Sequence, residues 1–499
     1  MADREHPAGK DQSMRMPWSN IVFKISLAAV TLLGAALFPG PVWAGDMTFQ
    51  TSEKVAAYFE KAKENESTLI AFLHKMPKGG DLHNHLYGDI EAEDILASAV
   101  AQGLFFDRAE KEFVEKKPEN PHFTAEEMTD IFWHRAEILE AISMRNTWRS
   151  GESGHEHFFR SFFRFIRALP EDSAMMREAM IRAVNQRLSY VEFMTYPVSP
   201  AHVAEVEKIR REVLADFAKD GLDWNLEIRY IYPLDRNSDL SSFQEQLQEA
   251  LEAFYNPEMK TVAITMLSPE DAHISQRDFL AQMAVLDNAW KDYDARSLKN
   301  PNQYPTPPVF TLHAGELTLE YAAYRSMLDR ISKSIELGHA SRIGHGVSII
   351  WENDVYGLLK MMRDRKIPVE ICLTSNKGIL DVSGGGRHPF KLYREAGVPL
   401  VIATDDEGLS RSNMTIEYGL AAHWFKLSYG EIKWLAMNSL EYSFLPGESL
   451  FMEGDFNKMK EKPESIVKTS EKAKMQENLL KAFADFEKDM EKVIDDFGW

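Results

Sequence analysis

The sequence GDLHNH, at residues 80–85, ends a short strand-like run with two histidines two positions apart. Side chains alternate between the two faces of a β-strand, so His83 and His85 point to the same side and can share one metal ion. Three later stretches also place a metal-binding or proton-handling side chain at the end of an apolar run. They are TLHAGE (311–316), RIGHG (342–346) and IATDD (402–406).

Eight strand-like runs recur along the chain, mostly separated by stretches long enough for a helix. They cover residues 80–86, 190–194, 226–232, 261–267, 308–313, 341–345, 368–373 and 399–404. This alternation predicts an α/β fold, a parallel (β/α)8 TIM barrel, whose active site lies at the carboxyl ends of the strands. All four motifs would then meet at one barrel mouth.

The segments outside the barrel are predicted as follows. Residues from about 90 to 185 read as a helical insertion that covers the barrel mouth, with a separate helical domain as the alternative. Residues 51–76 and about 464–499 each read as one helix. The part from residue 45 to 499 would form a single domain.

The N-terminal 44 residues are predicted to be a signal peptide. An apolar run at 25–38 follows Arg15 and Lys24, and small residues suit cleavage near Ala44. The product would be secreted or periplasmic, with an uncleaved anchor as the alternative. The formal net charge of −20 argues against nucleic acid and anionic membranes as partners. The single cysteine, Cys372, excludes an intramolecular disulfide and reads as a buried strand residue.

The motifs predict a hydrolytic metal centre. His83, His85, His313 and Asp405 would bind one Zn²⁺ per chain and leave a position open for water, although iron or manganese also suits such ligands. The fourth strand offers no lysine or acid before Glu270, so the sequence favours one metal over two.

Three further side chains are predicted to handle protons. Glu316 follows His313 by three residues, in a loop above the barrel; the alternative is an acid at the N-terminus of a helix. His345 would accept a proton from water or hold the hydroxide. Asp406 would face the substrate or support the metal ligands.

The motif set resembles the adenosine/AMP deaminase family over roughly residues 75–450. The resemblance rests on MPKGGDLHNHLYG (76–88), HAGE (313–316), SN (375–376) and NSLEYSFLP (438–446), with IGHG and TDD between them. The MPKG stretch (76–79) and the predicted secretion signal look most like the secreted, growth-factor-related branch of this family. Members of that branch in animals carry an extra disulfide-bearing domain, which this chain lacks.

The resemblance implies a mechanism and a substrate. The four ligands would hold zinc, and Glu316 would protonate purine N1. His345 would orient the attacking hydroxide, and Asp406 would form a hydrogen bond with purine N7. Adenosine would give inosine and ammonia, and deoxyadenosine would be deaminated in the same way.

The substrate side departs from the family pattern. Tyr87 replaces an acid that commonly meets the ribose, and the loop at Ser268 lacks a glycine that usually contacts the purine. A deaminase of another aminopurine or modified nucleoside therefore stays open, as does an inactive nucleoside-binding protein. The expected partner is a small purine nucleoside, with no nucleic acid, no membrane after cleavage, and a homodimer left open.

Overall fold

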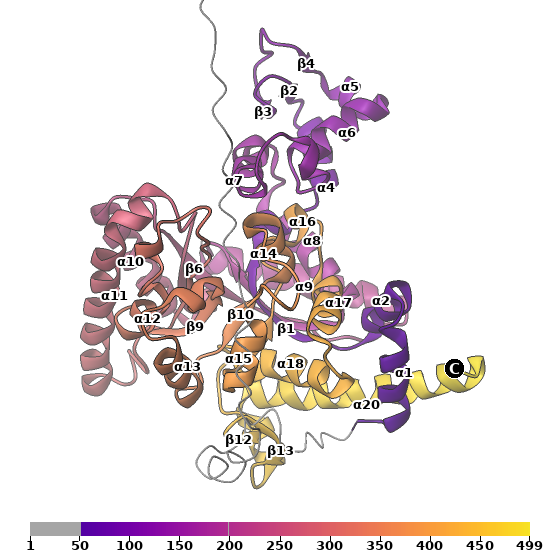
Figure 1. The fold of residues 1–499 in the computed structure, drawn as a ribbon, viewed down its shortest axis with the longest axis vertical. Helices are drawn as coiled ribbons and strands as arrows, with labels where there is room; N and C mark the ends of the chain where they lie inside the picture. Colours follow the sequence, from indigo (N-terminus) through magenta and orange to yellow (C-terminus); the bar gives the residue numbers. More distant parts are fainter. Residues whose placement is uncertain (1–50, 198) are drawn as a thin grey trace, which may run out of the picture.

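The computed structural model describes residues 51–197 and 199–499 (Figure 1). The predicted signal segment and its cleavage near Ala44 lie outside the described residues and stay predictions. Within the described part, no helix has both the length and the apolar composition that a bilayer crossing requires.

Eight parallel strands form the barrel that the sequence predicts. In sheet order they are β1 (Gly79–His85), β5 (Leu188–Met194), β6 (Glu227–Asp235), β7 (Thr261–Leu267), β8 (Phe310–Ala314), β9 (Ala340–His345), β10 (Val369–Ile371) and β11 (Leu400–Ile402). The first and last strands meet where the Asp405 N–H donates to the His83 carbonyl at 2.9 Å and the His85 N–H donates to the Asp405 carbonyl at 3.1 Å. The predicted (β/α)8 fold is therefore confirmed.

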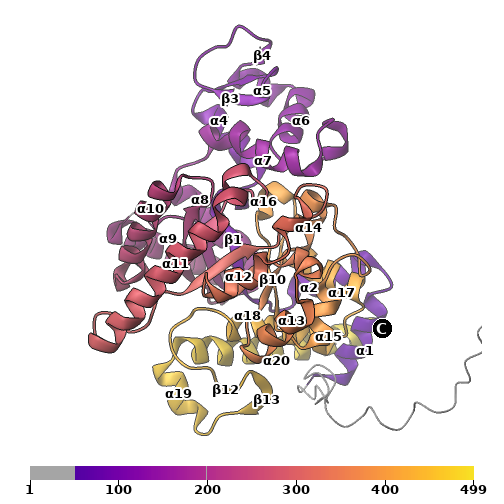
Figure 2. The same ribbon diagram turned by 60° about the vertical axis from the view of Figure 1, so that its left-hand side comes forward.

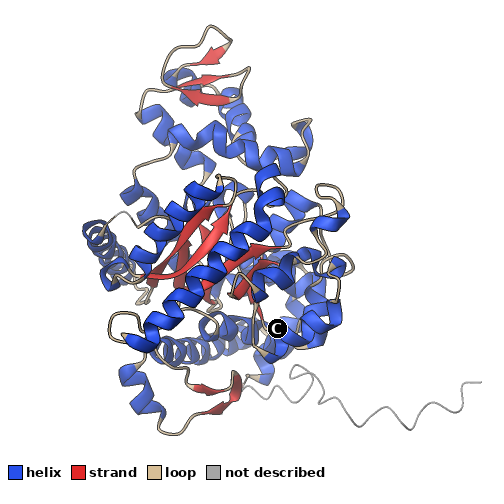
Figure 3. Cartoon of the chain, turned by 90° about the vertical axis from the view of Figure 1, so that its left-hand side faces the viewer, coloured by secondary structure: helices blue, strands red, loops and turns tan. Residues whose placement is uncertain are grey.

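Helices cover the outside of the barrel (Figure 3). They are α8 (Asp172–Asn185), α9 (Pro200–Lys219), α10 (Leu240–Phe254), α11 (His273–Lys299), α12 (Arg330–Glu336), α13 (Val355–Asp364), α14 (Leu373–Leu380), α15 (Phe390–Ala396), α16 (Glu407–Ser410), α17 (Met414–Phe425) and α18 (Tyr429–Glu441). The strands are largely buried on both faces, as parallel strands in such folds are. Local signals set the helix starts: Ser199 caps α9 ahead of Pro200, and Ser428 forms a capping box with Glu431.

The insertion between β1 and β5 forms a lobe at one end of the barrel (Figures 1 and 2). Its helices are α3 (Leu86–Asp89), α4 (Ala92–Ala101), α5 (Ala125–Asp130), α6 (Phe132–Ala141) and α7 (Gly154–Phe165). It also holds a small antiparallel sheet of β2 (Phe105–Asp107), β3 (Glu112–Val114) and β4 (His122–Phe123), which the sequence does not predict because strands of two or three residues show no alternation. Its buried Phe106 and Phe113 belong to the same hydrophobic cluster as the barrel.

The sequence predicts one helix near each end of the described chain, but the structure divides each of them into two helices. Residues 51–76 form α1 (Glu53–Ala62) and α2 (Glu66–Lys75), because extended Asn65 accepts a hydrogen bond from the Thr68 N–H at 3.1 Å and starts a new helix.

The C-terminal part begins with a hairpin of β12 (Phe451–Met452) and β13 (Asp455–Met459), and then forms α19 (Pro463–Thr469) and α20 (Glu471–Phe497). The predicted single helix breaks at Ser470, which caps α20. Helix α20 packs on its own chain: Lys433 of α18 contacts Glu487 at 2.8 Å, and Phe72 of α2 meets Phe486 with ring centroids 5.2 Å apart.

A buried lysine fixes the start of β1. The Lys78 ammonium donates to the carbonyls of Leu73 at 2.6 Å, Met76 at 3.0 Å and Gln186 at 2.8 Å. These bonds tie the end of α2 and the end of α8 to the strand that carries His83. Burial lowers the pKa of Lys78 well below its ordinary value.

Candidate active site

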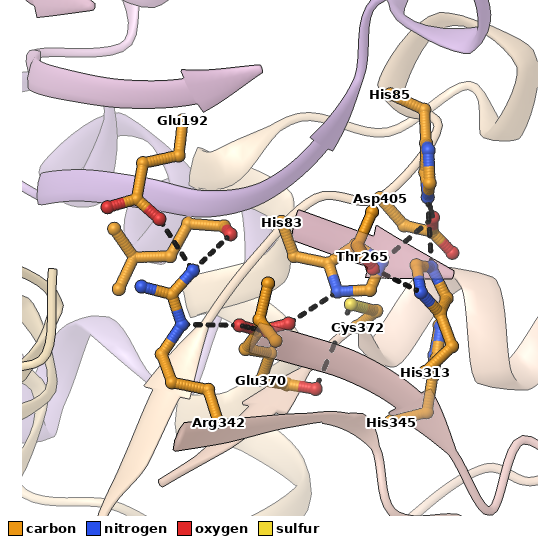
Figure 4. Close-up of polar contacts among 12 residues, drawn as sticks. His83, His85, Glu192, Thr265, His313, Arg342, His345, Glu370, Cys372 and Asp405 are labelled. Carbon is orange, nitrogen blue, oxygen red and sulfur yellow. Dashed lines mark hydrogen bonds and ion pairs between the residues drawn. The ribbon is translucent and has the colours of Figure 1, made fainter. Parts of the chain in front are cut away.

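The four motifs meet at the carboxyl ends of the strands (Figure 4). His83 and His85 end β1, His313 lies near the end of β8, His345 ends β9, and Asp405 and Asp406 follow β11. All of these residues except His83 line a cavity of about 340 Å³, together with Glu316. His83 lies behind the cavity, fully buried, against the other imidazoles.

The geometry of His83, His85, His313 and Asp405 fits a tetrahedral metal ion. Their ligand atoms all lie within 4.8 Å of one another. His85 Nε2 is 3.2 Å from both His313 Nε2 and Asp405 Oδ1, and His83 Nε2 is 3.5 Å from Asp405 Oδ1. Ligands bound about 2.0–2.1 Å from a tetrahedral zinc lie about 3.4 Å apart, which matches these separations.

Two residues of the site hold left-handed backbone conformations. Asp405 has φ 64° and His345 has φ 65°, values that side-chain-bearing residues adopt at a cost of about 1–3 kcal/mol. The barrel-closing hydrogen bonds hold Asp405 in place. Beside His345, the Tyr393 hydroxyl donates to the Gly346 carbonyl at 2.7 Å. Packing around the site therefore sustains conformations that the local sequence disfavours.

A buried carboxylate that the sequence analysis misses supports the first histidine. Glu370 of β10 accepts from Arg342 at 2.6 Å and from Thr311 at 2.7 Å, and its other oxygen lies 2.7 Å from His83 Nδ1 (Figure 4). Burial alone would raise the pKa of Glu370, but the Arg342 charge and the His83 hydrogen bond hold it at about 2. A bond at Nδ1 leaves Nε2 of His83 free to bind a metal. The sequence does contain a sign of this role, because Glu370 is the one charged residue inside the apolar run 368–373.

A second missed carboxylate positions the loop that carries Glu316. Glu270 accepts from the Gly315 N–H at 3.1 Å and the Glu316 N–H at 2.7 Å, and its Oε1 lies 3.3 Å from Arg330 Nε. The Glu270 carboxylate therefore bonds to the loop and to Arg330, and it is not among the grouped metal ligands His83, His85, His313 and Asp405. No helix begins at Glu316 in the described chain, so the alternative of a helix-capping acid is wrong.

The three proton-handling residues face one another across the site. Glu316 Oε1 lies 3.7 Å from His345 Nε2. Burial, followed by the charge of Asp405, raises the pKa of Glu316 and of Asp406 well above the ordinary carboxyl value. Oδ1 of Asp406 and Nε2 of His345 are buried without a protein hydrogen-bond partner. These atoms are available to a bound molecule.

Aromatic side chains form the outer part of the cavity. Phe158, Phe159, Phe162 and Phe163 of α7 line it, with Tyr87, Thr195 and Tyr196 nearby. All three residues predicted to bind the substrate line the cavity: Asp406, half-buried Tyr87 on α3, and Ser268, which has φ 82° after β7. None of the described residues that line it is a lysine or an arginine. Cys372 does not line the cavity. It is fully buried as expected, but it follows β10 and does not lie in the strand, and its Sγ lies within 4.8 Å of ligand atoms of His345 and Asp405. Burial raises the pKa of its thiol.

Comparisons with known proteins agree with this geometry. Residues 307–450 match the family model described as adenosine deaminase. An adenosine deaminase of Clostridium acetobutylicum is 26% identical over 267 residues, covering 52% of this chain and 78% of the relative. A human N6-methyl-AMP deaminase is 24% identical over 388 residues, covering 77% of this chain and 93% of the relative.

The fold is also shared with a solved structure. An amidohydrolase from Burkholderia ambifaria with bound Zn superposes with a TM-score of 0.50 at 18% identity, covering 89% of this chain and all of the other. The barrel, the histidine–aspartate cluster and these sequence matches agree. The chain is therefore similar to the adenosine deaminase family of metal-dependent hydrolases, and it is a hydrolytic deaminase of an adenine-type substrate.

Proposed function

We propose that this chain binds one Zn²⁺ and hydrolyses the 6-amino group of adenosine and deoxyadenosine, giving inosine or deoxyinosine, respectively, and ammonia. The observation that carries the proposal is the meeting of a three-histidine, one-aspartate cluster with Glu316, His345 and Asp406 at one cavity. A protein that only binds nucleosides has no need of such a proton-transfer set, so an enzyme is favoured over an inactive binding protein.

His83, His85, His313 and Asp405 would hold the zinc. Three nitrogen ligands and one oxygen ligand suit this ion, and their spacing matches a tetrahedral centre. Bound zinc acts as a Lewis acid that makes a water molecule nucleophilic at neutral pH.

The remaining residues would position the purine and move protons. Glu316 donates a proton to N1, which makes C6 electrophilic while the water oxygen bonds to it. Asp406 keeps its proton and donates a hydrogen bond to N7, an atom that can only accept. After giving its proton to N1, the Glu316 carboxylate takes a proton from the water and passes it to the amino nitrogen. The bond between C6 and that nitrogen then breaks, and ammonia leaves. The C6 hydroxyl returns its proton to Glu316 as the carbonyl of the product forms.

The lining of the cavity favours a substrate without phosphate. A phosphate group in a pocket is normally met by lysine, arginine or clustered N–H donors. The lining here is aromatic at its outer part, with Tyr87 and Ser268 as polar groups at its sides and acids at the zinc end. This argues for a nucleoside over a nucleotide. The same aromatic wall favours a second candidate, a modified adenine nucleoside with an apolar substituent.

The test is ultraviolet detection of deamination by the zinc-loaded protein spanning residues 45–499. Adenosine, deoxyadenosine, adenine and AMP are compared at neutral pH, with a Glu316→Gln variant that keeps the shape of the side chain but removes the acid. The control is Glu320→Gln, the same change on an exposed residue of the same loop.

The proposal expects conversion of adenosine and deoxyadenosine by the wild type and by the control. It expects loss of activity, with zinc retained, in Glu316→Gln. Preference for AMP would refute the proposal that the substrate carries no phosphate. A zinc-loaded protein that releases no ammonia from any aminopurine would restore the hypothesis of a binding protein.

A further inference from the structure

A chain of hydrogen bonds leads from the backbone to the back of His345. The Phe390 N–H donates to His388 Nδ1 at 3.1 Å, His388 Nε2 lies 3.1 Å from Asn376 Oδ1, and Asn376 Nδ2 lies 3.0 Å from His345 Nδ1. The three side chains are 3%, 0% and 1% exposed. They belong to the loop before α15, to α14 and to the end of β9.

The backbone N–H at one end sets the direction of every bond. An N–H can only donate, so His388 Nδ1 has to be the unprotonated nitrogen that accepts. In a neutral imidazole the other nitrogen, Nε2, then carries the proton and donates to an oxygen. This places the oxygen of Asn376 toward His388 and its NH₂ group toward His345. The NH₂ group donates, so His345 Nδ1 also has to be unprotonated.

The environment of His388 keeps it in the form that this reasoning requires. Burial lowers the pKa of His388 to about 4, so the ring is neutral at neutral pH. A reversed Asn376 would point its NH₂ group at the N–H of His388. A proton on His345 Nδ1 would likewise face the NH₂ group of Asn376. Both arrangements set two buried donors against each other.

We propose that His388 is a positioning residue for deamination: acting through Asn376, it holds His345 in the tautomer that presents Nε2–H to the cavity. This inference rests on the proposed function of the site. His345 then donates a hydrogen bond to the attacking water oxygen and does not accept a proton from it. The proton that the water loses therefore passes to another group, and Glu316 lies 3.7 Å from His345 Nε2.

Two measurements on the zinc-loaded protein test the proposal. Neutron diffraction from deuterium-exchanged wild-type crystals should place deuterium on Nε2 of both His345 and His388, and none on Nδ1 of either ring. Steady-state kinetics then compares His388→Leu, which removes the donor, with His388→Gln, which keeps an N–H donor. Asn376→Asp presents only acceptors and so reverses the bond to His345.

His339→Leu serves as the matched control. Its ring also makes a side-chain hydrogen bond, which it donates to Asp287 at 2.8 Å, and it stacks on Trp290. His339 precedes β9 and so lies at the opposite end of that strand from His345. It should retain the wild-type kcat. This control separates the loss of a packed histidine from the loss of the hydrogen-bond chain.

The expected result is a fall in kcat of about 10- to 100-fold for His388→Leu and at least as much for Asn376→Asp, with little change in KM or zinc content. His388→Gln should recover most of the loss. Deuterium on Nδ1 of His345, or wild-type kcat in both His388→Leu and Asn376→Asp, would overturn the proposal. A wild type that deaminates no aminopurine would refute the proposed function instead, while the neutron result still tests the tautomer.

Discussion

Replacing Gly88 with alanine should disable Asp406 while the metal ligands stay in place. A Cβ atom on Gly88 would lie 1.7 Å from Asp406 Oδ1 and 2.4 Å from its Cγ, whereas real Cβ contacts essentially never fall below 3.0 Å. The carboxyl group therefore has to retreat by at least about 1.3 Å. A misplacement of about 1 Å in an active site can cost about 100-fold in rate, which corresponds to about 2.7 kcal/mol of transition-state stabilisation.

The assay is kcat/KM for adenosine, with zinc content and thermal unfolding measured on the same preparation. We expect a loss of about 100-fold for Gly88→Ala at unchanged zinc content. Gly386→Ala is the control, because no atom lies within 4 Å of the Cβ that it would add. Activity within threefold of wild type would show that Asp406 tolerates the displacement and would refute its positioned role. Loss of zinc would show that the strain reaches Asp405.

Three other perturbations follow from the same structure. Glu370→Gln should weaken zinc binding about 10- to 100-fold, because the carboxylate that supports His83 is lost; competition with a chelator measures this. Lys78→Met should lower the free energy of unfolding in urea by about 3 kcal/mol or more, because three buried carbonyls lose their donor. Burial alone would raise the pKa of Glu152, but Arg164 and His157 hold it at about 2, below the ordinary 4.5. The stability that Glu152 adds is therefore complete above about pH 4.5 and is lost as the pH falls toward 2, so the melting temperatures of wild type and Glu152→Gln should converge over that range.

The barrel and its site residues were accessible from the sequence because their signals are local. Short apolar runs mark strands, and a polar side chain at the end of such a run marks the carboxyl end of the strand. Parallel strands in a barrel bring those ends together, so the sequence alone places the seven site residues from His83 to Asp406 at one mouth. The breaks at Asn65 and Ser470 were missed because apolar residues at helical spacing lie on both sides of each break.

The supporting residues were decided by the tertiary structure alone. Glu370 reaches His83 across 287 positions of sequence. Asn376 of α14 reaches His345, and His388, in the loop before α15, reaches Asn376. A buried carboxylate, amide or imidazole has to find a hydrogen-bond partner, but which partner it finds depends on strands and helices that meet only after folding. Periodicity in the sequence therefore determined which side chains carry the chemistry, and packing between distant segments determined how each of them is held, oriented and protonated.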